Sequence, residues 1–242
     1  MSTIEVRKEV MQHIELSMDE LLEKYLKPID TTWQPSDFLP QSNSPEFFES
    51  VKEIQELAKE MDYDLFAVLI GDTITEEALP TYESWLMGLK GLTQGKRTGW
   101  TQWVRAWTAE ENRHGDLLNR YLYLSGRVNM REFEISTQHL INDGFDIQTG
   151  DDPYRNFVYT SFQERATNIS HRRVASKVKA TGNTLLAKLC GSIAADEARH
   201  ANAYIDFAKR IFDAVIPIPI TILSIPFPFS EIVSWPSPIL KI

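Results

Sequence analysis

The motif Glu-x-x-His occurs twice in this chain, at residues 111–114 and 197–200, each time inside a long stretch of helix-forming residues. Positions i and i+3 of a helix lie on one face, so each motif presents a carboxylate and an imidazole to the same point. Leu118 shares the face of the first motif and Tyr204 that of the second, which indicates that both faces are buried. Buried charge needs compensation, either from other side chains or from a cation.

The rest of the sequence favours an all-α fold. No alternating hairpin pattern bounded by Asn-Gly or Asp-Gly occurs, and a proline-rich connection at 27–45 separates the first two helical stretches. The most economical arrangement is a four-helix bundle with additional N-terminal helices. Apolar residues at helical spacing predict helices near residues 17–26, 45–61, 64–90, 99–125, 154–179 and 184–213.

Residues 215–242 have a different composition. This segment holds six of the twelve prolines, and its only charged side chains are Glu231 and Lys241. Its apolarity suggests a membrane span, but so many prolines remove too many backbone donors for a spanning helix. We therefore expect one domain at residues 1–214, an irregular proline-rich tail at 215–242, and no transmembrane span.

Charge and cysteine content restrict the compartment and the partners. The net charge is −9 and no Lys/Arg-rich run stands out, so a nucleic-acid partner is not expected. The single cysteine, Cys190, has no partner for a disulfide within this sequence and suits a reducing compartment. The first residues resemble neither a secretory signal nor a transit peptide, so the cytoplasm is expected.

Two metal ions would need more negative charge than two glutamates carry, and di-metal bundles supply one further Glu from each of the other two helices. Both are available in this sequence. Glu76 lies 35 residues before Glu111, and Glu164 lies 33 residues before Glu197. This near-equal spacing indicates two helix pairs around a pseudo-two-fold axis. The predicted ligands are Glu76, Glu111, His114, Glu164, Glu197 and His200.

The neighbouring Glu77 is the alternative to Glu76, since adjacent helical positions face about 100° apart and only one can point inward. Pro80 cannot donate a hydrogen bond to the carbonyl of Glu76, which predicts a kink at the ligand and favours Glu76. Four Glu and two His suit iron or manganese. A set of buried ion pairs without a metal is the alternative interpretation of these six residues.

Several strings between about residue 16 and about residue 212 resemble the soluble acyl-acyl carrier protein desaturases, the stearoyl desaturase family. The similar strings are WQPSDFLP, GDTITEEALPTY, RAWTAEENRHGDLLNRYLYLSGRV, YTSFQERAT and IAADEARH. The resemblance implies a ferritin-like bundle, two irons, O₂ as co-substrate, a ferredoxin-type electron donor and an acyl chain on acyl carrier protein. It implies the same six ligands, with Glu111 and Glu197 shared between the irons.

The resemblance also implies roles for four further residues. Thr167 could pass protons at the site, or its hydroxyl could bond to its own helix backbone. Asp196 would accept a hydrogen bond from a ligand imidazole and, with Trp33, form a route for electrons. Trp107 is a further candidate. Ordinary aromatic packing is the alternative for both tryptophans.

The implied reaction is desaturation of a carrier-bound acyl chain, stearoyl to oleoyl at Δ9, in fatty acid biosynthesis by a homodimer. An unactivated methylene has no useful acidity, so the reaction needs an oxidising cofactor, and a long apolar channel is expected to position the chain. The family has further helices after the second motif, where this sequence has its proline-rich segment, so we expect a C-terminally shortened domain. A ferritin-like iron oxidation or storage protein and an inactive truncated bundle are the alternatives.

Overall fold

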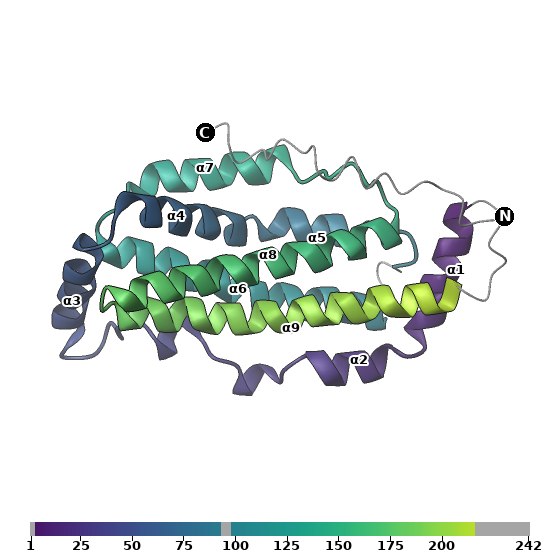
Figure 1. Cartoon of the computed structure of the whole chain (residues 1–242), viewed down its shortest axis with the longest axis horizontal. Coiled ribbons are helices and arrows are strands. Elements are labelled where there is room, and N and C mark those ends of the chain that lie inside the picture. The colour runs from purple at the N-terminus through teal and green to yellow at the C-terminus, as the bar shows by residue number, and fades with distance from the viewer. Residues whose placement is uncertain (1–2, 93–97, 216–242) are drawn as a thin grey trace.

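The computed structural model describes residues 3–92 and 98–215, and every regular element among these residues is a helix (Figure 1). The expected all-α bundle is therefore confirmed. Helices α8 and α9 run side by side along their length, with α6 and the α4–α5 pair packed beside them. These core helices are α4 (Tyr63–Glu77), α5 (Leu79–Met87), α6 (Gly99–Ser125), α8 (Pro153–Ala180) and α9 (Thr184–Val215).

Four shorter helices surround this core. Helices α1 and α2 pack against one end of α9, α3 packs against α6, and α7 packs against α4. The predicted helices at 17–26 and 45–61 are present, and two short 3-10 turns lie in the connection between them. Two of the four, α1 and α7, were not predicted. The bounds of the four are α1 (Thr3–Glu15), α2 (Met18–Tyr25), α3 (Phe47–Lys59) and α7 (Met130–Asp143).

The helix expected at 64–90 is interrupted where the sequence places Pro80. Helix α4 ends at Glu77, Ala78 has φ −73° and ψ 10°, and α5 begins at Leu79. The interruption follows from proline, which has no N–H to donate to the carbonyl of Glu76. The predicted kink is confirmed, and it lies directly after Glu76.

The turn between α8 and α9 fixes where the helix of the second motif begins. Gly182 has φ +88°, a conformation that glycine adopts without strain. The N–H of Asn183 then donates to the carbonyl of Val178 at 3.0 Å, and its side-chain oxygen accepts from the N–H of Leu186 at 3.0 Å. The side-chain amide of Asn183 also donates to the hydroxyl of Tyr121 at 3.0 Å. The start of α9 is thus anchored to both α8 and α6.

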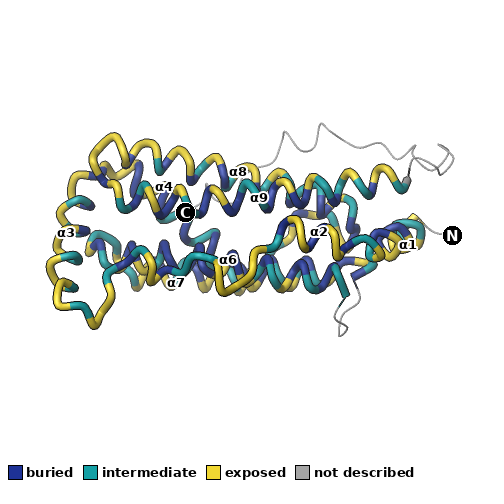
Figure 2. Tube along the Cα trace, turned by 90° about the horizontal axis from the view of Figure 1, so that it is seen from below, coloured by how far each residue is buried: buried dark blue, intermediate teal, exposed yellow. Residues whose placement is uncertain are grey.

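Buried positions line the inside of the bundle along its whole length (Figure 2). They form two apolar clusters, one around Trp103 and Phe207 and the other around Leu118 and Ile193. All four side chains are fully buried. Along α4, α6, α8 and α9 the buried side chains between the two clusters are mostly polar, and these include the predicted ligands.

The expectation of a proline-rich tail falls almost wholly on residues 216–242, which lie outside the described residues. Among the residues that the structure describes, no helix has both the length and the apolarity needed to cross a bilayer.

Candidate metal centre

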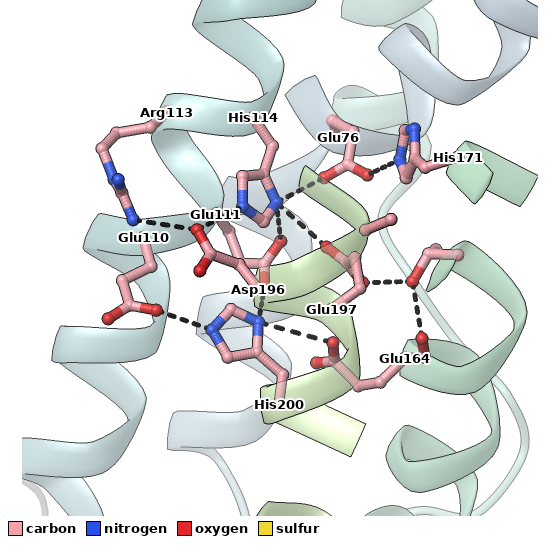
Figure 3. A network of polar contacts seen from close by, with 12 residues as sticks. Glu76, Glu110, Glu111, Arg113, His114, Glu164, His171, Asp196, Glu197 and His200 are labelled. Atoms are coloured by element: carbon pink, nitrogen blue, oxygen red, sulfur yellow. Dashed lines mark hydrogen bonds and ion pairs between the residues drawn. The ribbon is translucent and has the colours of Figure 1, made fainter. Parts of the chain in front are cut away.

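The six predicted ligands meet in the middle of the bundle (Figure 3). Glu76 comes from the last turn of α4, and α8 contributes one Glu, while α6 and α9 contribute one Glu-x-x-His motif each. All six side chains are buried, the most exposed of them being Glu76 at 7%. Glu77 points elsewhere, because its carboxylate accepts a hydrogen bond from Asn119 at 2.6 Å.

The first half of the centre is built around His114. Its Nδ1 lies 3.0 Å from Oε2 of Glu111, 2.9 Å from Oε1 of Glu197 and 3.6 Å from Oε2 of Glu76. Helices α4, α6 and α9 thus direct three carboxylates at one ring nitrogen. Because Glu111 and His114 are one helical turn apart, a single helix supplies two of these groups.

The second half is built around His200. Its Nδ1 lies 2.6 Å from Oε1 of Glu111 and 3.6 Å from Oε2 of Glu164. The ligand atoms form two sets, each within 4.8 Å, and Glu111 and Glu197 belong to both. The two sets are Glu76, Glu111, His114 and Glu197, and Glu111, Glu164, Glu197 and His200.

The donor set fits two cations better than it fits a closed network of hydrogen bonds. Five of the converging atoms are buried and have no well-directed hydrogen bond to any described residue: Oε1 of Glu111, Nδ1 of His114, Oε2 of Glu164, Oε1 of Glu197 and Nδ1 of His200. Buried polar atoms without partners are costly and call for an explanation such as a bound ion. Carboxylate oxygens and imidazole nitrogens suit divalent iron or manganese.

The pKa shifts of the buried ligands also favour bound cations. Burial would lower the pKa of His200, but the neighbouring carboxylates, Glu111 first, raise it well above its ordinary value. Burial and the charges of Glu197 and Glu111 raise the pKa of Glu164. Without a metal, protons therefore balance the charge of the carboxylates. Metal binding releases such protons, so a cation can take their place.

Trp107 and Thr167 both contact the ligands. The indole Nε1 of Trp107 donates to Oε1 of Glu164 at 2.8 Å, so its polar edge faces the centre. The hydroxyl of Thr167 lies 3.0 Å from the carbonyl oxygen of Glu164 and also contacts Oε2 of Glu197. Both interpretations of Thr167, a backbone hydrogen bond and a contact with the centre, are therefore compatible with its position.

Asp196 and Trp33 lie on the outer side of His114. The indole Nε1 of Trp33 donates to Oδ2 of Asp196 at 2.9 Å, and the same oxygen lies 3.7 Å from Nε2 of His114. The Trp33 ring also stacks on the His114 ring with centroids 5.8 Å apart. Since Trp33 is only half-buried, these three side chains form a continuous path from near the surface to the centre.

Two further side chains contact the ligands but were not predicted. Nε2 of His200 lies 2.8 Å from Oε2 of Glu110, and Nε2 of His171 lies 2.8 Å from Oε1 of Glu76. Glu110 directly precedes Glu111, just as Asp196 directly precedes Glu197, and this shared position is the sequence signal that could have identified it. His171 has no such signal, because it is 95 residues from its partner in the sequence.

Close packing beside the centre fixes the distance between α4 and α6. A Cβ atom on Gly115 would lie 3.1 Å from Cγ of Glu77 and 3.3 Å from the backbone carbon of Glu76. A side chain at this position would require α4 or Glu77 to shift by a few tenths of an ångström, so glycine lets the Glu76 backbone lie close to α6.

A small cavity lies against the carboxylates. Its volume is about 20 Å³, and Tyr82, Leu79 and Trp107 contribute to its walls. This volume holds about one water-sized molecule. The expected long apolar channel is therefore not formed by this cavity, which is too small for an acyl chain.

Comparison with known proteins identifies relatives over most of the chain. The sequence model described as "Fatty acid desaturase" matches residues 6–217. Stearoyl-[acyl-carrier-protein] 9-desaturase 5 of Arabidopsis thaliana is 53% identical over 208 residues, which covers 85% of this chain and 52% of the relative. The stearoyl-[acyl-carrier-protein] 9-desaturases of Linum usitatissimum and Ricinus communis are 53% and 51% identical, covering 82% and 85% of this chain.

All three relatives carry the word chloroplastic in their names. The chain spans about half the length of these curated relatives, which it covers to 52%, 51% and 52%. The matched region contains all six predicted ligands. On this match, the chain belongs to the fatty acid desaturase family.

Proposed function

We propose that this chain is an acyl-[acyl-carrier-protein] desaturase with two irons, which uses O₂ and electrons from a ferredoxin-type donor. The proposed reaction converts stearoyl to oleoyl on the carrier, with the double bond at Δ9. The observation that carries the proposal is the pair of ligand sets that share Glu111 and Glu197. The identity to stearoyl-carrier-protein 9-desaturases supports the substrate class and the bond position.

When bound, the di-iron group supplies the oxidising power needed to remove hydrogens from an unactivated methylene. The protein's own residues hold and orient it. Glu76 and His114 would bind one iron and Glu164 and His200 the other, with Glu111 and Glu197 shared between them. Trp107 orients Glu164 through its 2.8 Å hydrogen bond, which limits how far that carboxylate can rotate.

Electrons are proposed to reach the centre along Trp33, Asp196 and His114. The support for this route is the 2.9 Å hydrogen bond from Trp33 to Asp196 and the stacking of Trp33 on His114. Thr167 is proposed to hold and pass a proton beside Glu197, which its hydroxyl contacts. In this scheme Trp33 and Asp196 are positioning residues.

The test is incubation of the iron-loaded protein with reduced ferredoxin, O₂ and stearoyl carrier protein, followed by analysis of the fatty acid product. Oleate formed from the carrier-bound chain, with much less formed from free stearate, supports the proposal. Glu111→Ala should lose iron and product together, whereas Glu77→Ala should keep both. Iron oxidation without any unsaturated product would favour the iron-storage alternative instead.

Three further parts of the proposal concern the extent, assembly and location of the protein. The metal-binding domain is proposed to be complete within residues 1–214, since all six ligands lie between residues 76 and 200, and iron content after truncation at residue 214 tests this. A homodimer is proposed, with sedimentation as the test. The cytoplasm is proposed as the location, although the relatives named above are chloroplastic, and cell fractionation tests it.

A further inference from the structure

The two metal-binding motifs are longer than Glu-x-x-His. Residues 110–114 read Glu-Glu-Asn-Arg-His and residues 196–200 read Asp-Glu-Ala-Arg-His, so both follow the pattern acid-Glu-x-Arg-His. In each copy the second residue and the last residue are proposed ligands. The first residue and the arginine of each copy are not ligands. Figure 3 shows Glu110, Arg113 and Asp196 around the centre, and Arg199 contacts both acids.

The acids and histidines pair across the two helices. Glu110 of α6 accepts from Nε2 of His200 of α9 at 2.8 Å, and Asp196 of α9 lies 3.7 Å from Nε2 of His114 of α6. In both rings Nδ1 faces the carboxylates of the centre and the acid lies at the opposite ring nitrogen. Glu110 is within hydrogen-bond distance of its ring, whereas Asp196 is not. Such outer contacts set the orientation and tautomer of a ligating histidine.

Each arginine reaches the acid of the other helix and a backbone carbonyl of the N-terminal segment. Arg113 lies 3.4 Å from Asp196 and donates to the carbonyl of Trp33 at 2.5 Å. Nη2 of Arg199 donates to Oε2 of Glu110, and Nη1 of the same side chain donates to the carbonyl of Tyr25 at 2.6 Å.

The two halves differ in how many donors hold the acid. Asp196 accepts hydrogen bonds from Trp33 at 2.9 Å, Lys27 at 2.8 Å and Arg199 at 2.8 Å, in addition to its longer contact with Arg113. Glu110, by contrast, contacts only His200 and Arg199 among the interactions recorded for the described residues. Removing Arg199 therefore leaves Asp196 held by Trp33 and Lys27 but leaves Glu110 without its cation. Removing Arg113 leaves the contact between Arg199 and Glu110 in place.

We propose that Arg199 is a positioning residue for the His200 half of the metal centre, because it alone holds Glu110 against His200. This inference rests on the metal centre proposed above. It assigns different functions to the two arginines of a repeated motif. Loss of Arg199 should weaken one of two metal sites, whereas loss of Arg113 should have a smaller effect on metal binding.

The test titrates the metal-free protein, residues 1–242, with Co²⁺ and follows visible absorption and heat, so the readout does not depend on turnover. The original protein is expected to bind two equivalents. Arg199→Gln should bind one equivalent with unchanged affinity and the other about 10- to 100-fold more weakly, the usual range for loss of a residue that orients a metal ligand. Arg199→Lys should recover part of that loss.

A double-mutant cycle assigns the weakened site. In a His200→Ala background only the His114 site remains, and Arg199→Gln should not change its affinity for Co²⁺. In a His114→Ala background the His200 site remains, and Arg199→Gln should weaken its affinity for Co²⁺. Glu110→Gln serves as a second variant in case Arg199→Gln folds poorly, and it should weaken the same site. Arg127→Gln is the folding control, because Arg127 donates its hydrogen bonds to backbone carbonyls such as that of Met61, at 2.7 Å, and not to the centre.

The role of Arg199 and the existence of the di-metal centre can fail separately. Equal weakening of both sites by Arg199→Gln, or no weakening of either, would overturn the role of Arg199 while leaving the di-metal centre intact. An original protein that binds fewer than two equivalents of Co²⁺ would contradict the di-metal centre, and the assignment of Arg199 to one of its sites would fail with it.

Discussion

Shared and unshared ligands should be distinguishable by how much each contributes to metal-dependent stability. Glu111 belongs to both ligand sets, whereas Glu76 belongs to one. Alanine at position 111 should therefore remove both ions, and alanine at position 76 should remove only one. Glu77→Ala is the matched control, because Glu77 neighbours Glu76 but contacts Asn119 instead of the centre.

The magnitude follows from linkage. An ion present at about 100 times its dissociation constant stabilises the folded state by about 2.7 kcal/mol, so two independent ions contribute about 5.4 kcal/mol. Domains of this size gain about 2–4 °C in Tm for each kcal/mol. Metal should thus raise the Tm of the original protein and of Glu77→Ala by about 11–22 °C, and that of Glu76→Ala by about 5–11 °C. For Glu111→Ala the shift should stay below about 2 °C.

Differential scanning calorimetry of each variant with and without Fe²⁺ under anaerobic conditions gives these shifts. Comparing the two states of one variant removes the effect of the substitution on the metal-free fold. Equal shifts for Glu111→Ala and Glu76→Ala would refute the sharing of Glu111. A shift for Glu77→Ala as small as that for Glu111→Ala would refute the assignment of Glu76 as the ligand.

Three other outcomes are expected. Trp33→Phe keeps an aromatic ring near His114 but removes the donor to Asp196, so stopped-flow absorption should show slower reduction of the iron-loaded protein at unchanged iron content. Thr167→Val removes the hydroxyl that contacts Glu197 at similar volume, so the yield of unsaturated product per O₂ consumed should fall while iron content is kept. The pKa of Asp206 is lowered, since hydrogen bonds from Lys24 and Tyr25 outweigh partial burial, and its stabilisation is present above the unfolded pKa of about 3.9 and lost as pH falls through the folded value. Asp206→Asn should therefore lower the free energy of unfolding by about 0.5–1 kcal/mol at pH 7 in urea titrations, and by less at pH 3.

The sequence predicts the elements and ligands that have local periodic signals. The i, i+3 spacing of Glu197 and His200, the apolar faces of the core helices and Pro80 after Glu76 are all visible without coordinates. Helix α7 was not predicted, although Phe133, Thr137 and Ile141 recur at helical spacing and its signal was therefore present in the sequence. Helix α1 buries three residues, and apart from Ile4 and Val6 the rest of its sequence is polar.

Contacts between distant residues carry no such signal. His171 meets Glu76 only because α8 packs against α4, and nothing near either residue indicates the other. Glu110 shares with Asp196 its place directly before a shared Glu, but nothing local indicates that it is 6% exposed or that it contacts His200. Ligands that share one helical turn can be predicted from spacing, whereas the side chains that hold those ligands depend on how helices cross.

The separation of the apolar interior into two clusters has a consequence for cooperativity. Along α6, Trp103 belongs to one cluster and Leu118 to the other, and along α9, Ile193 and Phe207 are divided in the same way. The two ends of the bundle are joined by continuous helices but not by continuous apolar packing, and partly unfolded states open in units that share a packed core. In the metal-free protein, amide hydrogen exchange at the two ends should therefore proceed at different rates. Metal ions bound by α4, α6, α8 and α9 together would make the two ends unfold as one unit. The amide exchange rates of the two ends should then become similar.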